Sequence, residues 1–205
     1  GESNPGQAGE TGVTPLIYAS FNGYTEIVRM LIETGESNPG QVDKRGKTAL
    51  MYACYWAFEE IIKMLIETGE SKPGNADKYN QTALSCLVIK QRQLSIIKMV
   101  LETGESKPFY VGDDGKSVLI RAAEKGNVDI LRLLLDKNES NPSLLDENGK
   151  TACDHASNRK IRKTIIKYLI LKKVRERRRV VFDIIRFWRN IDELWKPNCN
   201  KVFYS

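Results

Sequence analysis

The chain has 205 residues, of which 41% are hydrophobic and 28% are charged, and its formal net charge is +6 at pH 7. No apolar run approaches the roughly 20 residues that a membrane-spanning helix needs, and no secretion signal opens the sequence. Four cysteines without a Cys-x-x-Cys pair and a single histidine argue against a disulfide scaffold or a zinc module. We therefore expect reduced thiols, no metal and a cytoplasmic protein that is not secreted.

The charge is divided unevenly along the chain. Residues 1–159 hold 18 Lys and Arg against 22 Asp and Glu, whereas residues 160–205 hold 14 against 4. The first part is thus mildly acidic and the end of the chain strongly basic, which predicts two segments with different surfaces.

A short loop sequence recurs at a nearly constant interval. It reads Thr-Gly-Glu-Ser-Asn-Pro at residues 34–39, returns with Lys in place of Asn at 68–73 and 103–108, and stands in degraded form at 137–142. A second landmark keeps the same period of 34 or 35 residues: Thr14, Thr48, Thr82, Ser117 and Thr151. Such a period is typical of stacked supersecondary units, so function is expected on the surface of a solenoid rather than in an active-site pocket.

Each unit predicts two short helices. The Thr or Ser of the second landmark can cap the first helix, and a break that is often glycine, such as Gly23 or Gly126, separates it from a second helix. The second helices are expected at residues 26–32, 60–66, 95–101 and 129–135, each followed by about ten residues of turn chemistry. The first six residues align with the loop at 35–40, which predicts that the chain begins in mid-repeat as a fragment of a longer array.

The period alone also fits the tetratricopeptide repeat, but the order of short helix, tight turn, second helix and protruding turn resembles the ankyrin repeat. The start of that repeat, Thr-Pro-Leu-His-x-Ala, is matched by Thr14-Pro-Leu-Ile-Tyr-Ala19. The resemblance covers residues 1–170 and implies an all-α ankyrin-repeat solenoid with units that begin near 14, 48, 82, 117 and 151. Only Pro15 keeps the proline, and no copy has histidine in the usual position. The loop sequence also resembles ankyrin arrays of large DNA viruses and protists, which bears only on source.

The resemblance further implies a partner-binding face made of the turn tips and the exposed ends of the first helices. Tyr55 and Trp56 end a first helix near the basic tip at Lys44 and Arg45, and such residue types dominate interface energetics. The alternative is that Trp56 only fills space beside Ala57. The candidate partner-binding residues are Lys44, Arg45, Lys47, Tyr55, Trp56, Lys78, Tyr79, Lys116 and Lys125.

Residues 171–205 form a separate C-terminal segment in this interpretation. Apolar residues from Val174 to Trp195 recur at spacings of three, four and seven, which predicts an amphipathic helix. We expect it to cap the open end of the stack, although a second apolar edge also suits docking of a partner. The basic run at 172–179 has three interpretations: a solvated face, a nuclear-import-like patch, or a surface for acidic membrane or nucleic acid.

The sequence contains no nucleophile–base pair, phosphate-binding loop or metal-ligand spacing. It therefore predicts a non-catalytic scaffold or adaptor that binds a protein partner, acts as a monomer, and uses no cofactor and no small-molecule substrate. Two alternatives stay open. One is a targeting module that uses the basic C-terminal helix to reach acidic membranes or the nucleus, and the other is the substrate-recruiting arm of an enzyme outside this sequence.

Overall fold

The computed structural model describes residues 10–35, 37–107, 110–136 and 140–195, and these contain nine α-helices and no strand. The chain divides into two compact units, residues 1–165 and 166–205. The helices are α1 Pro15–Asn22, α2 Thr25–Glu33, α3 Ala49–Trp56, α4 Glu59–Glu67, α5 Ala83–Ile89, α6 Leu94–Glu102, α7 Val118–Lys125, α8 Val128–Asp136 and α9 Arg159–Trp195. None of the described helices is both long and apolar enough to cross a membrane.

The recurring Thr or Ser residues are the helix N-caps that the sequence predicts. The hydroxyl oxygen of Thr48 accepts a hydrogen bond from the backbone N–H of Met51 at 3.2 Å, which satisfies one of the free amides of the first turn of α3. Thr14, Thr82 and Ser117 cap α1, α5 and α7 in the same way. One short polar residue per unit therefore fixes where each first helix begins.

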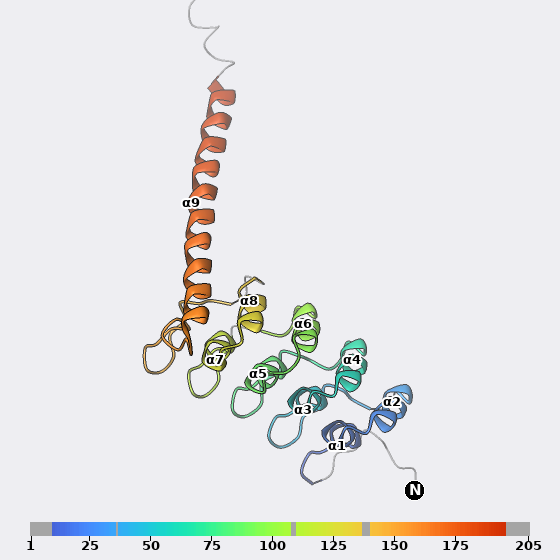
Figure 1. Cartoon of the computed structure of the whole chain (residues 1–205). Helices are drawn as coiled ribbons and strands as arrows, with labels where there is room; N and C mark the ends of the chain where they lie inside the picture. Colours follow the sequence, from blue (N-terminus) through green and yellow to red (C-terminus); the bar gives the residue numbers. More distant parts are fainter. Residues whose placement is uncertain (1–9, 36, 108–109, 137–139, 196–205) are drawn as a thin grey trace, which may run out of the picture. The chain divides into compact units, whose positions relative to one another are not determined.

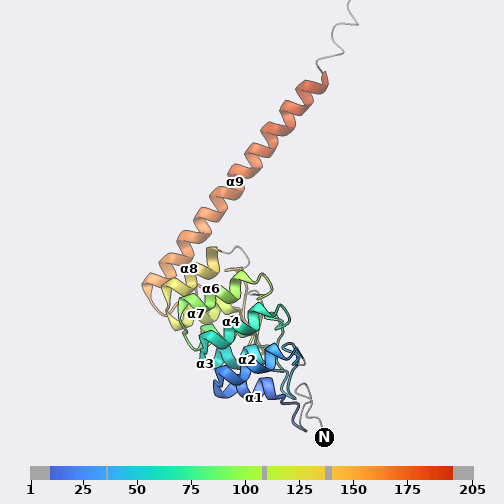
Figure 2. The same cartoon turned by 90° about the vertical axis from the view of Figure 1, so that its right-hand side faces the viewer.

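The helices of the first unit pack as repeated pairs (Figures 1 and 2). Each first helix contacts the next in one row, α1, α3, α5 and α7, and the second helices α2, α4, α6 and α8 contact each other in a second row. Leu65 in α4 and Leu134 in α8 are fully buried between the rows, as the shared register predicts. Leu31, expected in the same buried position, is only half-buried because α2 has a neighbouring second helix on one side, α4.

The turn tips are built on buried aspartates. Asp43, Asp77 and Asp146 each accept two backbone hydrogen bonds through Oδ1, from the residues two and four positions later. Neighbouring tips are also joined by backbone hydrogen bonds, from Lys44 N–H to the Thr11 carbonyl at 3.1 Å and from Lys78 N–H to the Arg45 carbonyl at 2.9 Å. The tips thus form a continuous row along the edge of the first helices (Figure 1).

The fifth unit differs from its prediction. Residues 152–155 form a turn rather than a first helix. Thr151 and Asp154 exchange hydrogen bonds of the kind that begin a helix, but Asn158 already caps a new helix through the N–H of Ile161, which leaves no room for a first helix of the usual length. That helix, α9, runs for 37 residues without a break at the expected boundary between residues 170 and 171. No Pro or Gly lies between Arg159 and Trp195 to end it.

Candidate functional site

Aromatic side chains gather on the exposed sides of α1 and α3. Phe21 meets Tyr52 edge-on with ring centroids 5.4 Å apart, and Trp56 lies 6.1 Å from Phe21 and 5.1 Å from Tyr55. Phe21 and Trp56 remain 43% and 44% exposed, and Tyr18 is 59% exposed. We call these five residues the aromatic cluster. It leaves a large apolar surface in water, and such surface marks interaction sites more often than isolated exposed residues do.

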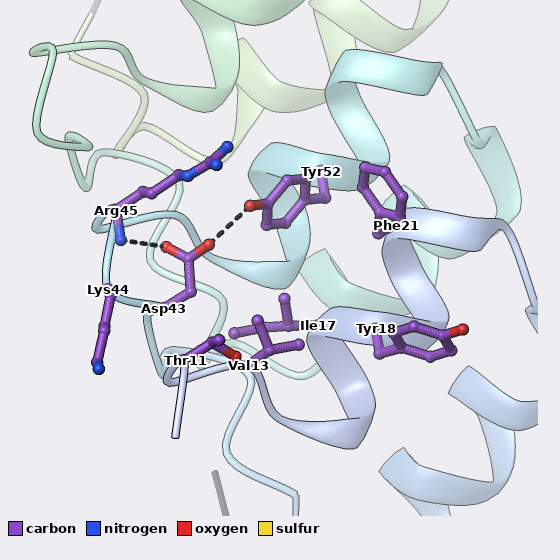
Figure 3. Close-up of a pocket in the computed structure, with 9 residues that line it drawn as sticks. All are labelled: Thr11, Val13, Ile17, Tyr18, Phe21, Asp43, Lys44, Arg45 and Tyr52. Atoms are coloured by element: carbon purple, nitrogen blue, oxygen red, sulfur yellow. Dashed lines mark hydrogen bonds between the residues drawn. The ribbon is translucent and has the colours of Figure 1, made fainter. Parts of the chain in front are cut away.

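A cleft of about 470 Å³ opens beside this cluster (Figure 3). Residues of α1 form one wall, two neighbouring turn tips form another, and Tyr52 of α3 stands at the back. Its lining residues are Thr11, Val13, Ile17, Tyr18, Phe21, Asp43, Lys44, Arg45 and Tyr52. The cleft is therefore apolar in its walls and carries two cations at its rim.

One buried carboxylate sets the shape of that rim. Asp43 Oδ1 accepts the N–H groups of Arg45 and Lys47 at 2.8 and 2.9 Å, and its Oδ2 accepts the Tyr52 hydroxyl at 2.7 Å. Burial, reinforced by the Asp43 carboxylate, raises the pKa of Tyr52, so this hydroxyl stays a hydrogen-bond donor. With its backbone fixed in this way, the tip exposes the side chains of Lys44 and Arg45 to solvent.

Two lysines approach the aromatic rings. Lys90 Nζ lies 4.3 Å from the centroid of the Tyr55 ring and lowers the pKa of the Tyr55 hydroxyl. Lys47 Nζ lies 5.7 Å from the Tyr52 centroid and 3.6 Å from the buried Asp77 carboxylate. Lys90 is exposed, whereas Lys47 is half-buried and joins two turn tips.

The structure separates the predicted partner-binding residues into two groups. Lys44, Arg45, Trp56, Lys78, Tyr79 and Lys125 are exposed and Tyr55 is half-buried in the aromatic cluster. Lys47 and Lys116 are engaged within the fold, since Lys116 binds the Glu124 carboxylate. Lys44 and Arg45 line the cleft, but Lys116 and Lys125 belong to the α7 unit and do not.

The partner-binding residues predicted from the sequence include none of Tyr18, Phe21, Tyr52 and Lys90. A signal for them existed. Tyr18 and Tyr52 both stand four residues after a capping threonine, and Phe21 and Tyr55 follow each of them by three, which places each pair on one face of its helix. Two aromatic residues on one face of two successive first helices therefore predict an aromatic cluster where those helices are neighbours.

The other polar clusters of the described residues are explained by the fold. The Asp113–Asp114 pair holds its turn tip, because Asp114 Oδ1 lies 2.7 Å from Arg121 and Asp113 accepts the Asn80 amide at 2.7 Å. Cys54 and Cys86 are buried free thiols, and burial raises the pKa of Cys86 to about 11. In the part of the chain that the structure describes, no three His, Cys, Asp or Glu side chains are grouped as metal ligands would be.

Comparison with known proteins agrees with this architecture. A family model described as ankyrin repeats, in three copies, matches residues 16–109 and 89–178, which together are most of the chain. The match extends into α9 but bears neither on the partner-binding face nor on a viral or protist source. No curated protein matches the sequence.

Proposed function

Since the chain belongs to the ankyrin-repeat family, whose repeats mediate protein–protein interaction, we propose that it is a non-catalytic scaffold whose partner docks on a front surface. This front surface consists of the aromatic cluster, the cleft beside it, and the exposed cations Lys44, Arg45, Lys78 and Lys90. A rigid row of hydrogen-bonded turn tips displays these groups without rearrangement, which lowers the entropic cost of binding.

The observation that carries this proposal is the exposed aromatic cluster beside Arg45. Trp, Tyr and Arg provide most of the energy of protein interfaces when a partner covers them. Phe21 and Trp56 are large enough to anchor such a contact and are nearly half exposed without one. Ile89 of α5, in the register position of Phe21, is half-buried, and Lys90, in the register position of Trp56, is exposed. This end of the first helices therefore faces solvent in successive units, and the rings there do not fill the core.

The charges around the cluster suggest the chemistry of the partner segment. Lys44, Arg45, Lys78 and Lys90 are exposed, while the carboxylates between them, Asp43 and Asp77, are buried and hydrogen-bonded to the tips. The front surface therefore presents cations around an apolar cleft. A segment with an aromatic or aliphatic anchor flanked by Asp or Glu would complement it.

The test changes one residue of the aromatic cluster and one cation at the rim of the cleft together. Trp56→Ala with Arg45→Glu should weaken binding by about 2 kcal/mol or more, measured as the loss of partners captured from cell lysate and as the affinity of each recovered partner. A matched control, Met30→Ala with Lys63→Glu, removes one exposed apolar residue and reverses one cation on the second-helix row. Equal binding by parent and front variant, with both folded, would place the interface elsewhere.

We also propose that the protein works as a monomer in the cytoplasm. The half-exposed rings of the front surface suit a transient contact with another protein, and buried free thiols suit a reducing compartment. Light scattering during size-exclusion chromatography tests the monomeric state. Imaging of a tagged chain tests the cytoplasmic location.

A further inference from the structure

Helix α9 has two different apolar faces. Ile161 and Ile165, in its first two turns, are fully buried in the repeat unit. Among residues 166–183, Leu169 is half-buried and seven large apolar side chains are exposed: Ile166 43%, Ile170 58%, Leu171 45%, Val174 42%, Val180 56%, Val181 56% and Phe182 70%. At about 100° per residue, these seven fall within one arc of about 200°, and Ile161 and Ile165 point to the opposite side. The exposed arc is therefore not a continuation of the face that packs against the repeats.

Seven cations lie between residues 166 and 183, on both sides of the helix. Four cations lie within the apolar arc, Lys167, Lys173, Arg177 and Arg178, and all four are exposed. The only acidic residues between 166 and 183 are Glu176 and Asp183, and both lie on the opposite side of the helix. The apolar arc consequently carries cations and no carboxylate, whereas the opposite side carries both charges.

Three kinds of occupant could cover such a face. A second copy would bring the same cations against each other, which costs free energy. An apolar groove of a protein would have to bury the heads of Lys173, Arg177 and Arg178 together with the neighbouring apolar side chains. An anionic bilayer surface accommodates both kinds of residue, because long basic side chains extend their charged heads to lipid phosphates while the apolar side chains enter the acyl boundary.

We propose that residues 166–183 of α9 bind in the plane of membranes rich in anionic phospholipids, with the apolar arc facing the lipid. The segment is 18 residues long, so its arc extends over about 27 Å of bilayer surface. This segment shares no residues with the front surface. Its binding would bring a protein held by the front surface to a membrane. Its free energy of binding comes from apolar burial together with attraction of the cations to the negative surface.

The experiment uses the full chain and sedimentation with vesicles of phosphatidylcholine alone or with about a third phosphatidylserine, a strongly anionic surface. Two triple variants remove the same charge from opposite sides of the helix. Lys173→Gln, Arg177→Gln and Arg178→Gln change the apolar arc, and Lys172→Gln, Arg175→Gln and Arg179→Gln change the opposite side. A third variant, Ile170→Gln with Val174→Gln and Val181→Gln, removes apolar residues of the arc. Circular dichroism confirms that each retains its helix.

We expect the parent to bind the anionic vesicles and not the neutral ones. The arc-charge and arc-apolar variants should lose about tenfold or more in affinity, and the opposite-side variant should lose less than about threefold. If the two charge variants lose the same affinity, or if the apolar variant binds like the parent, the attraction is diffuse. Either result would overturn the proposal that the apolar arc faces the lipid. Absence of binding to anionic vesicles would overturn the proposal of membrane binding and leave an acidic protein as the occupant of the arc.

The Trp56→Ala, Arg45→Glu variant should bind vesicles like the parent. Failure of the proposed membrane site is therefore distinguishable from failure of the proposed front surface.

Discussion

The imidazole Nε2 of His155 lies 2.7 Å from the Asp146 carboxylate. Its Nδ1 lies 3.0 Å from Glu124 Oε1, so the ring joins the last turn tip to the end of α7. Tyr52 holds Asp43 in the same way nine residues along the chain, and His155 is nine residues after Asp146. The single histidine therefore takes the structural place of a tyrosine in an earlier unit.

Replacing His155 with Ala should lower the midpoint of thermal unfolding by a few degrees. The substitution leaves the buried Asp146 Oδ2 without its donor and removes the link to Glu124. His155→Tyr should retain most of the stability, because a hydroxyl at this position already serves Asp43. If the Ala and Tyr variants have the same melting temperature, the hydrogen bond from residue 155 to Asp146 does not contribute to stability.

The stability of the last turn tip should depend on pH through Asp146. Hydrogen bonding from the backbone N–H of Lys150, with a further contribution from His155, lowers the pKa of Asp146 from 3.8 to about 2. A folded pKa below the unfolded one means that this stabilisation is complete above about pH 4 and is lost as the pH falls toward 2. Parent and Asp146→Asn should therefore differ in melting temperature at pH 6 and converge only as the pH falls to about 2. A constant difference across this range would contradict the assignment.

A glycine at position 57 should stabilise the protein. Ala57 adopts φ 63° in the turn between α3 and α4, where the units of α1 and α7 have Gly23 and Gly126 at φ 75° and 77°. The left-handed conformation costs a residue with a Cβ about 1–2 kcal/mol, and the added chain entropy of glycine offsets part of that gain. We expect Ala57→Gly to raise the free energy of unfolding by about 0.5–1 kcal/mol in urea denaturation. Ala53→Gly, inside α3, should lower it.

Leucine positions of the second helices should differ according to their neighbours. Leu65→Ala and Leu134→Ala should each cost about 2–5 kcal/mol of unfolding free energy, because both side chains are fully buried. Leu31→Ala should cost less than about 2 kcal/mol, since that side chain is only half-buried. Urea denaturation of the three variants checks the order, and a Leu31 variant as unstable as the others would contradict it.

Repeat-level features of the fold were predictable from the sequence because each depends on a local signal. Thr48 caps its helix through its own hydroxyl, and the register places Leu65 and Leu134 in the same buried position. The roles of Lys47 and His155 were not predictable, because their partners Asp77 and Glu124 lie about 30 residues away. The aromatic cluster was predicted only in part, through Tyr55 and Trp56. Its contact with Phe21 depends on how closely α1 and α3 pack.

The last turn of the array also departed from the repeat pattern for a local reason. Thr151 still resembles the other capping residues, and it exchanges helix-start hydrogen bonds with Asp154. Asn158 then starts α9 only seven residues after Thr151. A sequence pattern that scores one landmark at a time cannot weigh these competing caps.

Removal of residues 174–205 should test how much of α9 stabilises the array. Sequence analysis predicts that this segment caps the stack, which requires its loss to lower the melting temperature and promote aggregation. The described side chains from Val174 to Phe182 are exposed, whereas Ile161 and Ile165 are buried and remain in the truncated chain. We therefore expect the truncated protein to melt within about 3 °C of the parent, a change of roughly 1 kcal/mol or less, and to stay monomeric by light scattering. Ile165→Ala in the full chain should cost about 2–5 kcal/mol by comparison. A large fall in the melting temperature on truncation would instead assign the capping role to the end of the chain beyond residue 183.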